Sequence, residues 1–133
     1  MTEAIRTVVV ERDFSHRPEK LWRALTQPHL LAEWLMESDF APDVGHKFRF
    51  TADWGAVDCQ IKEIEPQRSL SYSWDAYGLE STVTWTLTPI GTGTRLRMEQ
   101  AGFTRDQDAA YKGSRASWPH FFTTLEKLLA GLE

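Results

Sequence analysis

The C-terminal stretch of the chain places the strongest constraint on the fold. Apolar residues recur there at intervals of three and four, at Trp118, Phe121, Phe122, Leu125, Leu128, Leu129 and Leu132. This spacing predicts one continuous apolar stripe on an amphipathic helix, which we expect to span residues 104–132. Thr104 and Gln107 have the form of a capping box at its start. Because the stripe contains three aromatic rings and four leucines, it needs a large apolar surface to pack on.

The middle of the chain alternates between apolar and polar residues, which is the pattern of half-buried strands. Turn residues divide it into short segments, so we expect strands over residues 47–52, 56–64, 70–74, 81–88 and 95–100, after a first strand at 7–14. The apolar phase slips at Ile64, which predicts a β-bulge near Lys62 and Glu63. Short connections favour antiparallel pairing, and the polar half of each strand leaves one face of the sheet in water.

Two short helices are expected between the first strand and the others. Ser15 is a candidate N-cap for the first helix, and Thr26-Gln27-Pro28 separates it from the second. A loop over residues 36–45 follows. The predicted order is therefore β-α-α-β-β-β-β-β-α, which describes one α+β domain over residues 1–133. In it, a curved antiparallel sheet of six strands wraps around the long C-terminal helix.

Composition and charge exclude several kinds of partner. The net charge of −4 comes with scattered lysines and arginines, so we expect no binding to nucleic acid and no membrane insertion. The single cysteine, Cys59, excludes an internal disulfide, and without a signal-like N-terminus it favours the cytoplasm. We interpret Cys59 as a small buried hydrophobic residue. No cofactor motif is present, and no metal site is expected because the four histidines are widely separated, at His16, His29, His46 and His120.

The expected C-terminal helix changes character along its length, and this change predicts a ligand pocket. Residues 113–117 are mostly small, the following residues are large, and Pro119 lies between the two halves, where it predicts a kink or break. Large side chains fill the space beneath a sheet, whereas small ones leave it open. We therefore expect a pocket between sheet and helix, lined by inward-facing side chains: Trp34, Phe48, Phe50, Cys59, Tyr72, Trp74, Val83, Trp85, Met98, Gln100, Ser114, Trp118, Phe121 and Phe122.

Several motifs distributed over nearly the whole chain resemble one known superfamily. They are VERDF at 10–14, PEKLWRALTQP at 18–28 with Trp34, Gly45 before Phe48 and Phe50, IEP at 64–66 with LSYSW at 70–74, TWTLTP at 84–89 with GTRL at 93–96, and Gly102-Phe103. Together they resemble the START-like or Bet v 1-like helix-grip superfamily (SRPBCC), in the branch of the C-terminal domain of the heat-shock-protein-90 ATPase activator. The resemblance implies a helix-grip fold. It also implies a function like that of other members, which bind or transport hydrophobic molecules or, in a few cases, act as cyclases or hydrolases.

The leading hypothesis is a domain that binds a small apolar or aromatic molecule without a cofactor. Two alternatives stay open. One is a cyclase- or hydrolase-like enzyme that polarises its substrate through Tyr72 and Gln100, although no facing pair of carboxylates is visible for acid–base catalysis. The other is an interaction module, either a homodimer or a co-chaperone, that uses Trp54 and the loop at residues 36–40. No sequence motif supports the chaperone partner directly.

Overall fold

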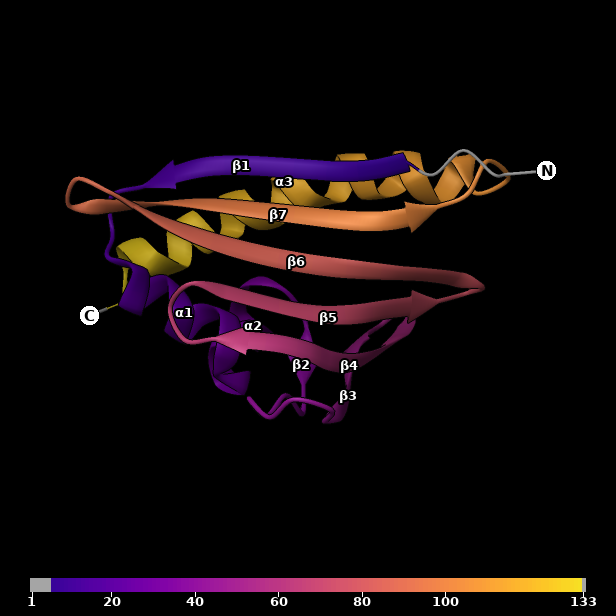
Figure 1. Ribbon diagram of the computed structural model, residues 1–133, viewed down its shortest axis with the longest axis horizontal. Coiled ribbons are helices and arrows are strands. Elements are labelled where there is room, and N and C mark those ends of the chain that lie inside the picture. The colour runs from indigo at the N-terminus through magenta and orange to yellow at the C-terminus, as the bar shows by residue number, and fades with distance from the viewer. Residues whose placement is uncertain (1–5, 133) are drawn as a thin grey trace.

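An antiparallel sheet and one long helix form the two layers of the protein (Figure 1). The structure is a computed structural model, and it describes residues 6–132. The elements follow one another as β1 (Arg6–Phe14), α1 (Pro18–Thr26), α2 (Pro28–Trp34), β2 (Glu37–Ser38), β3 (Lys47–Ala52), β4 (Gly55–Glu65), β5 (Ser69–Ala76), β6 (Leu79–Ile90), β7 (Gly93–Phe103) and α3 (Asp108–Ala130).

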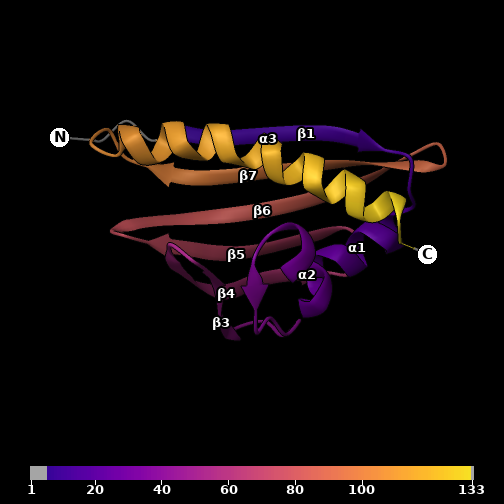
Figure 2. The same cartoon turned by 180° about the vertical axis from the view of Figure 1, so that it is seen from behind.

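The sheet has seven strands in the order β1-β7-β6-β5-β4-β3-β2, all antiparallel to their neighbours. Figure 2 shows the three helices on one face of this sheet, with α3 running from beside β1 towards α1. The predicted α+β helix-grip fold is therefore confirmed. The count of six strands is wrong by one, because β2 lies in the segment that we expected to be a loop and pairs only Glu37 with Thr51 and Ser38 with Phe50.

The core lies between the helices and the inner face of the sheet. Trp118, Phe122, Leu125 and Leu129 of α3 are buried, so the predicted stripe is the surface that anchors the helix. The register of β4 and β5 shifts between Ile61 and Glu63, which confirms the predicted bulge. None of the helices within residues 6–132 is long and apolar enough to cross a membrane.

Both expected helix caps differ from the structure. The residue at the N-cap of the first helix is Arg17 rather than Ser15, and no side chain caps the helix, because an arginine side chain has no hydrogen-bond acceptor. Helix α3 begins at Asp108, not at Thr104. The Thr104 N–H does reach the Gln107 Oε1 at 2.9 Å, but the Thr104 hydroxyl donates to Asp106, so this motif closes a turn ahead of the helix.

Pro119 lies inside α3, which is continuous from Asp108 to Ala130, so the alternative of a break there is wrong. A proline removes one helical hydrogen bond and crowds the carbonyl four residues earlier, here that of Arg115. Figure 2 shows the helix axis changing direction part-way along, as such a local loss allows. The first part of α3 therefore follows β1, while the second part crosses the sheet.

Candidate functional site

A cleft opens where the first half of α3 passes over the sheet. Its volume is about 400 Å³, and its lining is aromatic, apolar or small: Met36, Trp54, Trp74, Tyr77, Ala110, Gly113, Ser114, Ser117, Trp118 and Phe121. No charged side chain belongs to this lining. A larger hollow of about 640 Å³ lies between the β4–β5 turn and β6, but exposed turn residues at 65–68 form much of its wall. The cleft under α3 is therefore the better candidate for an apolar ligand.

The helical wall of the cleft has a simple origin in the sequence. Residues 110, 113, 114, 117, 118 and 121 recur every three or four positions, so they share one face of α3. The first of them are small, so their side chains leave the space between this face and the sheet unfilled. A Cβ atom built on Gly113 would have no neighbour within 4 Å, so there is open space at this point of the wall.

Two tryptophans form the deep end of the cleft, and a chain of buried hydrogen bonds joins them. The Trp118 Nε1–H donates to Gln100 Oε1 at 2.8 Å, and the Gln100 Nε2 donates to Ser81 Oγ at 3.0 Å. The Ser81 hydroxyl in turn donates to the backbone carbonyl of Trp74 at 2.7 Å. The rings of Trp74 and Trp118 are 5.2 Å apart, and Gln100 is fully buried. We call this the Trp118–Gln100–Ser81–Trp74 relay, and it joins the Trp118 indole to the backbone of Trp74.

The mouth of the cleft has a rim of two exposed aromatic side chains from different hairpin turns. Trp54 is 55% exposed and Tyr77 is 79% exposed, with ring centroids 6.0 Å apart. The Tyr77 hydroxyl donates to the Trp54 carbonyl at 2.6 Å. This bond requires glycine at position 55, because a Cβ there would collide with the Tyr77 hydroxyl and because Gly55 has φ +144°. The β3–β4 and β5–β6 turns are thereby held together over the cleft.

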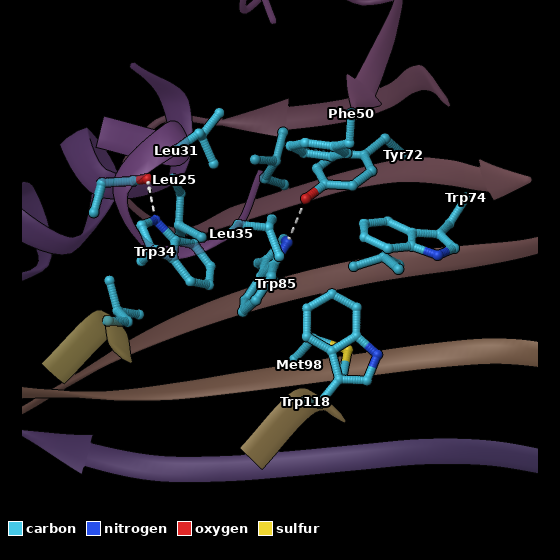
Figure 3. Close-up of a cluster of buried hydrophobic side chains, with 14 of the residues drawn as sticks. Leu25, Leu31, Trp34, Leu35, Phe50, Tyr72, Trp74, Trp85, Met98 and Trp118 are labelled. Atoms are coloured by element: carbon cyan, nitrogen blue, oxygen red, sulfur yellow. Dashed lines mark hydrogen bonds between the residues drawn. The ribbon is translucent and has the colours of Figure 1, made fainter. Parts of the chain in front are cut away.

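The sequence-predicted site residues fall into two groups. Trp74, Ser114, Trp118 and Phe121 line the cleft. The remaining candidates pack against one another in the closed core, several of them as Figure 3 shows: Trp34, Phe48, Phe50, Cys59, Tyr72, Val83, Trp85, Met98, Gln100 and Phe122. Their part in binding a ligand stays a prediction. The sequence reasoning left Met36, Trp54 and Tyr77 out of the site, since all three lie in or beside connections whose meeting depends on the tertiary fold.

The two titratable side chains among the core candidates are held neutral. The Tyr72 hydroxyl accepts a hydrogen bond from Trp85 Nε1 at 2.9 Å, and burial raises the pKa of Tyr72 well above its ordinary value (Figure 3). Burial likewise raises the pKa of the Cys59 thiol, with smaller contributions from nearby carboxylates. A thiol in this state is a poor nucleophile. Within residues 6–132 no group of three His, Cys, Asp or Glu side chains is placed to hold a metal ion.

Comparison with known proteins identifies the family. The family profile described as activator of Hsp90 ATPase homolog 1-like protein matches residues 15–130. The chain belongs to this family. Among solved structures, protein MLL2253 from Mesorhizobium loti is 56% identical, with a TM-score of 0.93 over 96% of this chain and 99% of that one. A protein from Rhodobacter sphaeroides is 31% identical, with a TM-score of 0.80 over 96% of this chain and 94% of that one.

A more distant solved structure shares the fold alone. The Aha1 dimer from Colwellia psychrerythraea is 18% identical, with a TM-score of 0.84 over 93% of this chain and 96% of that one. A comparison with curated protein sequences gave no match. The predicted resemblance to the START-like superfamily, in the branch of the Hsp90 ATPase activator, is therefore confirmed.

Proposed function

We propose that this family member binds a small, flat, uncharged molecule in the cleft beneath α3. The observation that carries the proposal is the pair Trp54 and Tyr77, two exposed aromatic rings held over a cleft whose deep wall is also aromatic. Large aromatic side chains are costly to leave in water unless a ligand or partner covers them. A volume of about 400 Å³ is in the range that small-molecule sites occupy.

The lining favours a neutral ligand over a charged one. A carboxylate or ammonium that entered the cleft would lose water without meeting an opposite charge, which is unfavourable by several kcal/mol, roughly. Two hydroxyl groups, those of Ser114 and Ser117, make no hydrogen bond to other described residues and lie on the helical wall. They are available to orient one polar group at the edge of an otherwise apolar ligand.

The test is a calorimetric titration with matched probes. We expect 2-naphthol, which is flat and neutral at pH 7, to bind, and 2-naphthoate, which differs by its charge, to bind at least about tenfold more weakly, a difference of about 1.4 kcal/mol. Ser114→Trp fills the cleft and should abolish the binding of 2-naphthol. Ala116→Trp places the same side chain at an exposed position outside the cleft lining and should leave binding unchanged. Equal affinity of the two variants would refute the proposal.

The catalytic alternative has less support. The hydroxyl of Tyr72 and the amide of Gln100 are engaged with buried neighbours, and neither residue lines the cleft. The homodimer alternative rests on the same exposed pair, Trp54 and Tyr77, and on the Colwellia protein of the same fold, which was solved as a dimer. Sedimentation of the protein over a range of concentrations separates it from ligand binding, because Tyr77→Ser would shift a dimer towards monomer.

A further inference from the structure

The edge of the sheet, away from the cleft, offers a second candidate binding surface. Strand β1 pairs with β7 on one side only, so it is the outermost strand at this end of the sheet. A hollow of about 530 Å³ runs along its other edge and is lined by Thr7, Val8, Val9, Val10, Tyr111, Arg115 and Pro119. We call this hollow the β1 groove. Figure 2 shows the corresponding arrangement, with the first half of α3 lying beside β1.

The lining shows that the backbone of β1 faces the groove. Side chains of successive strand residues point to opposite faces of a sheet, so residues 7–10 can all line one hollow only through their common backbone edge. Within residues 6–132, β1 makes no ladder with a strand on this side. Unpaired N–H and C=O groups on an edge strand are a template for another extended chain.

One face of α3 forms the helical wall of the groove. Tyr111, Arg115 and Pro119 are spaced four residues apart and therefore share one face of α3. Because Pro119 has no N–H, the carbonyl of Arg115 lacks its usual helical partner on this same face. An incoming chain would thus find the backbone hydrogen-bonding groups of β1, whereas the ring of Pro119 crowds the Arg115 carbonyl on α3.

The charge of the groove determines which chain fits it. Arg115 is the one charged side chain in the lining, it is exposed, and it makes no ion pair with any residue of 6–132. The guanidinium carbons of Arg6 and Arg115 lie 4.2 and 5.7 Å from the centroid of the Tyr111 ring. Arg6 is also bound to Asp108, but at an exposed position where such a pair is weak.

We propose that the β1 groove binds an extended acidic segment of a partner protein, which adds to the sheet as a strand beside β1 and presents carboxylates to Arg115 and Arg6. Residues 7–10 span about 13 Å at roughly 3.3 Å each, so the central part of the segment is short. A second copy of this chain is a poor occupant. Pairing of β1 with itself across a twofold axis would bring two Arg115 and two Arg6 side chains to the same groove, where their like charges repel.

The test uses a capped synthetic peptide of about seven residues that alternates glutamate and valine, titrated at low salt into ¹⁵N-labelled protein. We expect amide shifts in residues 6–14 and 111–118, and about tenfold weaker binding to Arg115→Glu. Lys127→Glu makes the same change of net charge at an exposed position near the other end of α3, outside the groove lining, and should leave the affinity unchanged. A peptide that alternates lysine and valine should bind more tightly to Arg115→Glu than to the wild-type protein.

Methylation of alternate peptide nitrogens tests the strand geometry, since it removes hydrogen bonds along one edge and should abolish binding. The proposal is overturned if the methylated and unmethylated peptides bind equally, or if Arg115→Glu and Lys127→Glu weaken binding alike. It is also overturned if the shifts in β1 appear without peptide as protein concentration rises, because a second copy then occupies the edge.

Discussion

The relay between Trp118 and Trp74 gives the sharpest prediction for stability. Replacing Gln100 by leucine removes both hydrogen bonds that its amide makes, at 2.8 and 3.0 Å. The Trp118 indole N–H is then left without an acceptor in a residue that is only 2% exposed, which costs about 1–3 kcal/mol. Ser81 loses the hydrogen bond that it accepts from Gln100 but still donates to the Trp74 carbonyl, so its part of the cost is smaller than that of Trp118. We expect Gln100→Leu to lower the free energy of unfolding by about 2 kcal/mol.

Urea unfolding followed by tryptophan fluorescence measures this loss, and an unchanged slope with urea concentration would show that only stability has changed. For a domain of this size the melting temperature should fall by about 4 °C per kcal/mol, or about 8 °C in total. Ser81→Ala is the companion variant: it leaves the bond between Trp118 and Gln100 intact but removes the partner of the Gln100 Nε2 and of the Trp74 carbonyl, so it should cost about 1–3 kcal/mol.

A double-mutant cycle isolates the indole bond itself. Trp118→Phe removes the N–H, so in the Gln100→Leu background it should cost about 1–2 kcal/mol less than in the wild type. If the changes in the free energy of unfolding caused by the two substitutions are additive to within about 0.3–0.5 kcal/mol, the relay does not couple Trp118 to Gln100 and the prediction is refuted.

Leu125, the glycines at 55 and 113, and His16 provide further tests of stability. Leu125→Ala should lower the free energy of unfolding by about 2–5 kcal/mol in urea, because Leu125 is 1% exposed under the sheet. Gly55→Ala should destabilise the protein by about 1–3 kcal/mol and detach Tyr77 from the rim. Gly113→Ala, at a position with open space around it, should stabilise α3 by about 0.5–1 kcal/mol. Melting curves should show a lower melting temperature for Gly55→Ala and a higher one for Gly113→Ala. Burial holds the pKa of His16 in the folded protein below its ordinary value of 6.5, so as pH falls the unfolded chain binds a proton at His16 before the folded protein does. The free energy of unfolding should therefore decline as pH falls below about 6.5. His16→Gln should flatten that decline, as measured by urea unfolding at a series of pH values.

Much of the fold could be predicted because its elements carry long, regular patterns. The stripe from Trp118 to Leu129 and the alternation in β6 each extend over many residues, so local sequence is sufficient to define them. Strand β2 has two residues, which is too short for any alternation to show. The start of α3 depends on whether the Thr104 hydroxyl donates to Asp106 or caps the helix. These two local hydrogen-bonding arrangements compete, and the sequence alone does not show which of them forms.

The candidate site likewise has a part that local sequence predicts and a part that depends on the tertiary fold. The small residues around Ser114 predicted where space is left open beneath α3, since side-chain volume is a local property. The rim could not be predicted, because Trp54 and Tyr77 lie in turns of two different hairpins and meet only once β3, β4, β5 and β6 are paired. Gln100 was recognised as an inward polar residue, but its partners lie on β6 and α3, far away in sequence.

The most direct test of ligand binding uses the six tryptophans of the chain as reporters. Each indole Nε1–H gives its own signal in a ¹⁵N correlation spectrum, and the signals can be followed during titration with 2-naphthol. We expect the signals of Trp54, Trp74 and Trp118, which line the cleft, to shift together with one dissociation constant, while those of Trp22 and Trp34 stay in place. Saturable shifts at Trp22 and Trp34 without shifts at the cleft tryptophans, or no saturable shift at all, would contradict the proposed function.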